Sequence, residues 1–197
     1  MMCIHTGIGQ RFIFYLHGKI VENQGPHAIE TVNGYGEYKY FDIIDSLKKR
    51  NFTVISQVRK PNTNVKAYAQ LVARQIDSLL NQGINPKYIT VIGASKGALI
   101  AMYVSTYAKN KDLNYVLMGS CDDEVYTYGA DITFTGNILS IYEKSDLANG
   151  TCQKFKDRST MISRYKEIEI NTGLRHGFIF RPLKQWLDPA IEWANTN

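Results

Sequence analysis

The chain has 197 residues with a formal net charge of +5, and 44% of its residues are hydrophobic and 21% charged. This balance is typical of a soluble globular protein, and the length suffices for one domain, residues 1–197, with a sizeable core. No apolar run approaches the roughly 20 residues that cross a bilayer. The 23 Lys and Arg are scattered among 18 acidic residues rather than gathered in a stripe, which speaks against a nucleic-acid partner.

Two kinds of apolar segment alternate along the chain. Short runs rich in β-branched and aromatic residues predict strands, and segments in which apolar residues recur three or four apart predict helices. In chain order, the predicted elements are strand 11–17, helix 40–49, strand 52–58, helix 64–82, strand 88–93, helix 96–107, strand 114–120, strand 137–142, strand 165–171 and helix 183–194.

Most of these strands are almost continuously apolar, as expected where both faces of a sheet are covered, whereas 165–171 alternates like a strand near an edge. Strands alternating with helices predict an α/β protein: a three-layer α/β/α sandwich around a mostly parallel sheet. The connections 18–38 and 121–136 have no clear pattern and are predicted to be long loops.

The N-terminal stretch and the cysteines indicate in which cellular compartment the protein is expected. MMCIHTGIGQ lacks a basic segment followed by an apolar core, so we expect a cytoplasmic chain or one whose leader has been removed. Cys3, Cys121 and Cys152 lie far apart without CxxC spacing, which speaks against a zinc cluster and favours reduced thiols.

The stretch Val91–Gly97, VIGASKG, ends a predicted strand on a serine between two glycines. Gly93-Ala94-Ser95-Lys96-Gly97 matches G-x-S-x-G, in which small flanking residues let a strained turn lift a nucleophilic serine above a sheet. The pattern is neither a P-loop nor a dinucleotide fingerprint. Alternatively, Ser95 is a small residue in a tight turn or a helix N-cap.

A serine hydroxyl becomes a good nucleophile when a base takes its proton, and the base needs an orienting carboxylate. Asp146 follows the fifth predicted strand and His176 follows the sixth, so both are expected at the same sheet edge as Ser95. Glu143, Asp122 and Asp123 also lie near strand ends and are alternative acids. His176 is alternatively a surface histidine.

An oxyanion formed by attack needs two preorganised N–H donors. The first strand ends in Leu16-His17-Gly18-Lys19, and the glycine permits a close backbone turn. We expect the amides of Lys19 and Lys96 to be the donors, with His17 holding the turn.

Together these features resemble the α/β-hydrolases of the small, lidless kind, from Arg11 to about Asn195. The resemblance implies a six-stranded sheet in spatial order 2-1-3-4-5-6, without the family's usual first two strands, and no cap domain. The oxyanion loop departs from the family, reading HGK rather than HGGG.

The resemblance assigns Ser95, Asp146 and His176 as a catalytic triad, with Gly18, Gly93 and Gly97 in support. It implies a serine hydrolase that cleaves a small carboxylic ester or thioester, with no cofactor or metal. A monomer or homodimer is expected, because an edge strand or the helix with Trp186 and Trp193 offers a surface for a dimer. Alternatives are an acyltransferase or peptidase with the same triad, or a non-catalytic binding protein.

Two residues have competing interpretations. Lys96 opposes the helix dipole at a helix N-terminus, so it is either a tolerated solvated side chain or a positive rim for acidic substrates. Cys121 lies in GSCDD, which lacks the second glycine of a cysteine nucleophile turn, so a half-buried thiol is expected.

Overall fold

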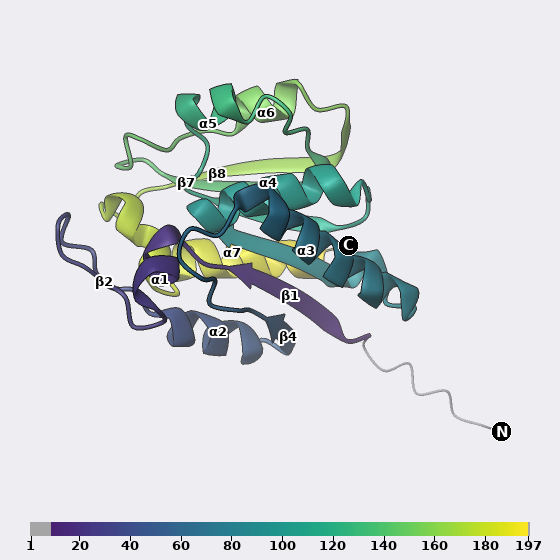
Figure 1. Ribbon diagram of the computed structural model, residues 1–197, viewed down its shortest axis with the longest axis horizontal. Helices are drawn as coiled ribbons and strands as arrows, with labels where there is room; N and C mark the ends of the chain where they lie inside the picture. Colours follow the sequence, from purple (N-terminus) through teal and green to yellow (C-terminus); the bar gives the residue numbers. More distant parts are fainter. Residues whose placement is uncertain (1–8, 197) are drawn as a thin grey trace.

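The computed structural model describes residues 9–196; residues 1–8, with Cys3 and most of the N-terminal stretch considered above, lie outside this range. Its main sheet has six strands, paired in parallel throughout in the order β4-β1-β5-β6-β7-β8 (Figure 1). This confirms the six predicted strands and their spatial order. The strands are β1 (Arg11–Leu16), β4 (Phe52–Ile55), β5 (Ile89–Ala94), β6 (Asn114–Met118), β7 (Thr135–Glu143) and β8 (Met161–Ile170).

Helices cover both faces of this sheet, as predicted for a three-layer sandwich. Side chains alternate along a strand, so Phe12 and Phe14 of β1 pack on one face with α3 and α4, while Ile13 and Tyr15 pack on the other with α2 and α7. Figure 1 shows α3 and α4 running side by side over β1. The helices expected from periodicity are α2 (Tyr40–Lys48), α3 (Val65–Asn81), α4 (Lys96–Ala108) and α7 (Lys184–Asn195).

The exposure of the outermost strand follows its sequence. β8 pairs only with β7, and its side chains alternate between exposed and partly buried along most of its length. Its edge position agrees with the prediction from the sequence, but both of its faces carry packed side chains: Tyr165 packs with the core on the α3 and α4 side, and Ile168 with the core on the α2 and α7 side.

Both connections predicted to be loops contain short elements. Their lengths of two to six residues are too short for an apolar period to show in the sequence. A further five-residue helix was not predicted. These elements are α1 (Lys19–Gln24), β2 (Ile29–Glu30), β3 (Gly36–Glu37), α5 (Asp123–Tyr128) and α6 (Gln153–Asp157).

The expectation of reduced thiols is wrong for two of the cysteines. Cys121, which follows β6, forms a disulfide with Cys152, which precedes α6; their Cα atoms lie 5.1 Å apart and 31 positions separate them in sequence. Cys121 is thus not the half-buried thiol expected: both residues are buried. Spacing alone could not reveal the pairing, because it depends on two loops meeting in space.

No helix of residues 9–196 has the length and apolarity that crossing a membrane requires.

Candidate active site

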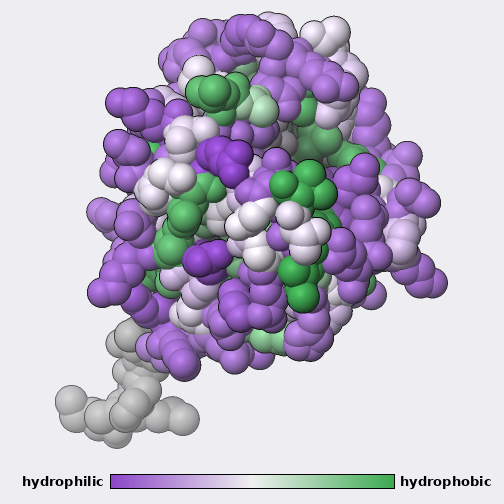
Figure 2. Space-filling model, turned by 90° about the vertical axis from the view of Figure 1, so that its left-hand side faces the viewer, coloured by the Kyte–Doolittle hydropathy of each residue, from purple (hydrophilic) through white to green (hydrophobic). Residues whose placement is uncertain are grey.

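The predicted site residues come together at the carboxyl ends of the strands. Ser95 follows β5, Asp146 follows β7 and His176 follows β8. Figure 2 looks onto this end of the sheet, where several groups of apolar side chains lie among the hydrophilic ones. Ligands bind at this end in open parallel sheets, because the loops that leave the strands converge there.

The turn at Ser95 is strained and tightly packed. Ser95 has φ 52° and ψ −122°, a conformation that L-residues rarely adopt, and its amide donates to the carbonyl oxygen of Met118 (2.8 Å). A Cβ added at Gly97 would lie 1.9 Å from the Leu16 carbonyl oxygen, and one at Gly93 would lie 2.4 Å from that of Gly97. Both glycines are therefore needed to bring α4 against β1 and β5.

His176 is held by a carboxylate. Its Nδ1 lies 2.6 Å from Oδ2 of Asp146, whose side chain is 6% exposed. Because an ionised carboxylate only accepts, this contact places the proton on Nδ1 and leaves Nε2 with a free lone pair. Among the described residues, neither Nε2 nor the Ser95 hydroxyl has a hydrogen-bond partner, although Ser95 and His176 line one cavity. Such bonds are often formed only in the substrate complex.

Asn149 is a member of this group that the sequence did not reveal. Its Nδ2 donates to Asp146 Oδ2 (3.2 Å) and lies 3.4 Å from His176 Nδ1. The amide thus fills a second acceptor position of the carboxylate and fixes its orientation toward the imidazole. Only the Asp146–Asn149 turn brings the two side chains together, and no motif marks it.

The alternative acids have other partners. Glu143 is buried and accepts hydrogen bonds from Ser145 and Thr172. Asp122 caps α5 by accepting from the amide of Val125. Asp123 is exposed and pairs with Lys154 on α6. In the described part of the chain, Asp146 is therefore the carboxylate that contacts His176.

The two amides expected to bind an oxyanion are both first residues of helices. Lys19 begins α1 and Lys96 begins α4, so neither N–H has an acceptor one turn back in its own helix. Helix N-termini also favour negative charge. A Cβ added at Gly18 would lie 3.6 Å from the Ser95 Cβ, so the loop leading into α1 runs directly beside the serine.

The Lys96 side chain is not free in solvent, which was one of its two expected positions. It is 16% exposed, and its Nζ lies 2.6 Å from Oε1 of Glu22 and 2.8 Å from the carbonyl oxygen of Thr63. It is therefore not a freely solvated side chain: its charge is paired with Glu22, at the edge of the cavity that Ser95 and Lys96 both line. The cost of a cation at a helix N-terminus is offset by a buried carboxylate.

His17 is buried beneath the same loop. Its Nε2 accepts from the amide of Arg59 (3.0 Å), so its Nδ1 carries the proton and donates to the carbonyl oxygen of Gly18 (2.8 Å). Burial and the nearby Arg59 guanidinium lower the pKa of His17 to about 4. The imidazole is therefore neutral at pH 7, and it links Arg59 to Gly18 through hydrogen bonds in the loop that follows β1.

Two cavities meet at Ser95. The larger, about 330 Å³, lies between the serine and α5, and the smaller, about 210 Å³, lies on the side of His176. The apolar residues of the larger are Val65, Leu99, Val125 and Tyr128. Those of the smaller are Ile20, Tyr35, Tyr38, Ile179 and Phe180.

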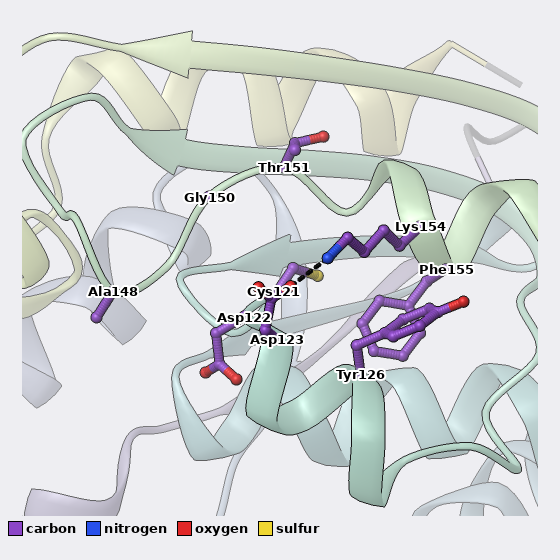
Figure 3. Close-up of a pocket in the computed structure, with 9 residues that line it drawn as sticks. All are labelled: Cys121, Asp122, Asp123, Tyr126, Ala148, Gly150, Thr151, Lys154 and Phe155. Carbon is purple, nitrogen blue, oxygen red and sulfur yellow. Dashed lines mark hydrogen bonds and ion pairs between the residues drawn. The ribbon is translucent and has the colours of Figure 1, made fainter.

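A third cavity, about 290 Å³, lies between α5 and α6 (Figure 3). Neither Ser95 nor His176 lines it. Figure 3 shows the Lys154–Asp123 ion pair crossing it close to Cys121. In residues 9–196, no group of three or more His, Cys, Asp or Glu side chains is arranged to hold a metal ion.

Comparison with known proteins identifies the fold. No family model and no curated protein matches the sequence. Among solved structures, a putative YdeN-like hydrolase from Pectobacterium atrosepticum is 12% identical, with a TM-score of 0.59 over 94% of this chain and 91% of that one. A fungal esterase from Rhizomucor miehei is 19% identical, with a TM-score of 0.56 over 94% and 73%.

A third similar structure is YbtT, a type II thioesterase from the yersiniabactin pathway, which is 9% identical with a TM-score of 0.53 over 94% of this chain and 92% of that one. Together with the six-stranded parallel sheet, these likenesses show that the chain has the α/β-hydrolase fold.

Proposed function

We propose that this protein is a serine hydrolase that cleaves a small carboxylic ester or thioester through an acyl-enzyme. The observation that carries the proposal is the His176–Asp146 contact of 2.6 Å at a cavity shared with the unpartnered hydroxyl of Ser95. A base with a carboxylate on one nitrogen and a free lone pair on the other is what a serine nucleophile needs.

In the acylation step, Nε2 of His176 takes the hydroxyl proton of Ser95 as Oγ forms a bond to the substrate carbonyl carbon. The carbonyl π electrons move onto oxygen, and the Lys19 and Lys96 amides stabilise the oxyanion. Asp146 stabilises the imidazolium through Nδ1. Collapse of the tetrahedral intermediate breaks the bond to the leaving group, which takes the proton from Nε2.

Deacylation repeats the sequence with water. Nε2 of His176 takes a proton from water as the oxygen attacks the acyl carbon, and the same amides hold the second oxyanion. Collapse returns the proton to Ser95 Oγ and releases the carboxylic acid. These steps need no metal or organic cofactor.

The substrate class rests on the cavities and on the fold. Cavities of about 330 and 210 Å³ suit modest acyl and leaving groups, and proteins with this fold include a fungal esterase and a type II thioesterase. An acyltransferase or peptidase would use the same residues with another acceptor or substrate. A non-catalytic binding protein is the alternative outside enzymes.

We also propose that residues 1–197 form one domain without a cap, acting as a monomer or homodimer and without a nucleic-acid partner. The cytoplasmic location expected from the N-terminal stretch is opposed by the Cys121–Cys152 disulfide, because the cytosol keeps most thiols reduced. An oxidising compartment fits the disulfide better.

The proposal is tested by assaying p-nitrophenyl esters and acyl thioesters of increasing acyl length. Ser95→Ala and His176→Ala should each lower kcat by roughly 10³-fold or more, since triad members act as a unit. The matched control is Ser78→Ala, which changes an exposed serine of α3 and should leave kcat unaltered. Full activity of Ser95→Ala would overturn the proposal.

A further inference from the structure

A group of buried charges lies directly behind the proposed oxyanion amides. The side chains of Glu22 and Arg59 are fully buried, and that of Lys96 is 16% exposed. Glu22 binds both cations: its Oε1 lies 2.6 Å from Lys96 Nζ, and its Oε2 lies 3.0 Å from Arg59 Nε. Burial alone would raise the pKa of Glu22, but hydrogen bonds from Lys96 and Arg59 outweigh it and hold the pKa below its ordinary value.

The first ion pair joins the two halves of the proposed oxyanion hole. Lys96 is the first residue of α4 and one of the two amide donors, while Glu22 belongs to α1, which begins at the other donor, Lys19. Thr63 strengthens the link from both sides: its carbonyl oxygen accepts from Lys96 Nζ (2.8 Å), and its amide donates to Glu22 Oε1 (3.2 Å). The separation of the two helix starts is thus fixed by side chains as well as by the backbone.

The second ion pair holds the strand end that leads into α1. Arg59 Nη2 donates to the carbonyl oxygen of His17 (2.5 Å), and the Arg59 amide donates to His17 Nε2 (3.0 Å). His17 in turn donates to Gly18, the residue before the Lys19 amide. The path from Glu22 through Arg59 therefore reaches the donor loop from its other end.

The composition of this cluster is not what stability alone would favour. Two cations and one carboxylate are buried together, His17 is neutral, and one positive charge is left without a counterion within the cluster; Arg59 Nη1 is buried without a hydrogen-bond partner. Apolar side chains of similar volume are often as stabilising as a buried ion pair. Excess positive charge beside helix N-termini instead suits a site where negative charge develops during reaction.

We infer that Glu22 is a positioning residue of the reaction, and that through Lys96 it sets the spacing of the two oxyanion donors and holds one net positive charge behind them. The inference rests on the proposed function. It assigns Lys96 two roles: its backbone amide contacts the oxyanion, and its side chain keeps that amide in place. A cluster of this kind acts on the tetrahedral state and hardly on the bound substrate.

The test compares Lys96→Met and Glu22→Gln with the wild type on one p-nitrophenyl ester. Removal of a whole oxyanion donor costs roughly 10² to 10³ in kcat, so displacement of a donor should lower kcat roughly 10- to 100-fold, with KM changed less than about twofold. The affinity for a phenylboronic acid, which forms a tetrahedral adduct with the serine, should fall by a similar factor. Lys96→Arg should recover part of both losses.

The control is Lys66→Met, which breaks the exposed Lys66–Asp131 pair and should change neither kcat nor boronate affinity. If Lys96→Met does not fold, Glu22→Asp takes its place: it keeps the charge, shortens the link and should still lower kcat at unchanged KM. Variants that fold and keep wild-type kcat and boronate affinity, even with lower melting temperatures, would overturn the inference. Failure of the proposed function is distinguishable, because the wild type itself would then lack activity.

Discussion

The disulfide gives a prediction whose magnitude follows from the structure. Cys121 and Cys152 close a loop with a sequence separation of 31. In the chain-entropy model, opening a loop of this length destabilises the folded state by about 4 kcal/mol. For a chain of this size, that corresponds to a fall in melting temperature of about 8 to 16 °C. The double variant Cys121→Ser/Cys152→Ser should show this loss, and reductant should lower the melting temperature of the wild type similarly.

The two loops that the disulfide joins also carry the site. Cys121 lies two residues beyond Gly119, where an added Cβ would lie 3.1 Å from the His176 ring, and Cys152 ends the segment that begins with Asp146. Opening the disulfide should therefore lower kcat in protein that remains folded.

Thiol titration of unreduced protein in guanidinium chloride should give one thiol per chain out of three cysteines. Three free thiols, or a melting temperature insensitive to reductant, would refute this reasoning.

Three further predictions concern packing, pH and the substrate. Gly97→Ala should destabilise the fold by about 1 to 3 kcal/mol and lower kcat, because its Cβ would meet the Leu16 carbonyl; Gly150→Ala, which has open space, is the urea-denaturation control. The pKa of His17 is about 4 in the folded protein and about 6.5 in the unfolded chain. As the pH falls below about 6.5, His17 is therefore protonated in the unfolded chain while it is still neutral in the folded one. This difference should lower the free energy of unfolding by about 2 kcal/mol between pH 7 and pH 5. In His17→Gln, the urea midpoint should depend less on pH by the corresponding amount. Emulsified long-chain triglyceride should give no rate enhancement over dissolved short-chain esters, and a marked enhancement would contradict an open, lidless site.

The strands and the serine turn were predictable because local sequence determines them. Apolar runs marked all six strands, and the glycines at 93 and 97 are required by backbone contacts that any residue with a Cβ would violate. The positions of Asp146 and His176 followed from the rule that parallel strands end at one edge of the sheet.

The remaining features depend on contacts between distant segments. Glu22 and Arg59 lie 37 positions apart in segments without a motif, so the pairing of Glu22 with Arg59 and Lys96 could not be read from spacing. The sequence accordingly left the Lys96 side chain either in solvent or at a positive rim, without a buried partner. The disulfide was missed for the same reason, because two unrelated loops bring Cys121 and Cys152 together.

The central claim is that the Ser95 hydroxyl is an activated nucleophile. The most direct measurement is intact-protein and peptide mass spectrometry after treatment with a fluorophosphonate, which reacts with serines activated by a neighbouring base. The account predicts one adduct per chain, located on the peptide containing Ser95 and absent from Ser95→Ala. No adduct on the native protein, or an adduct that persists in Ser95→Ala, would contradict it.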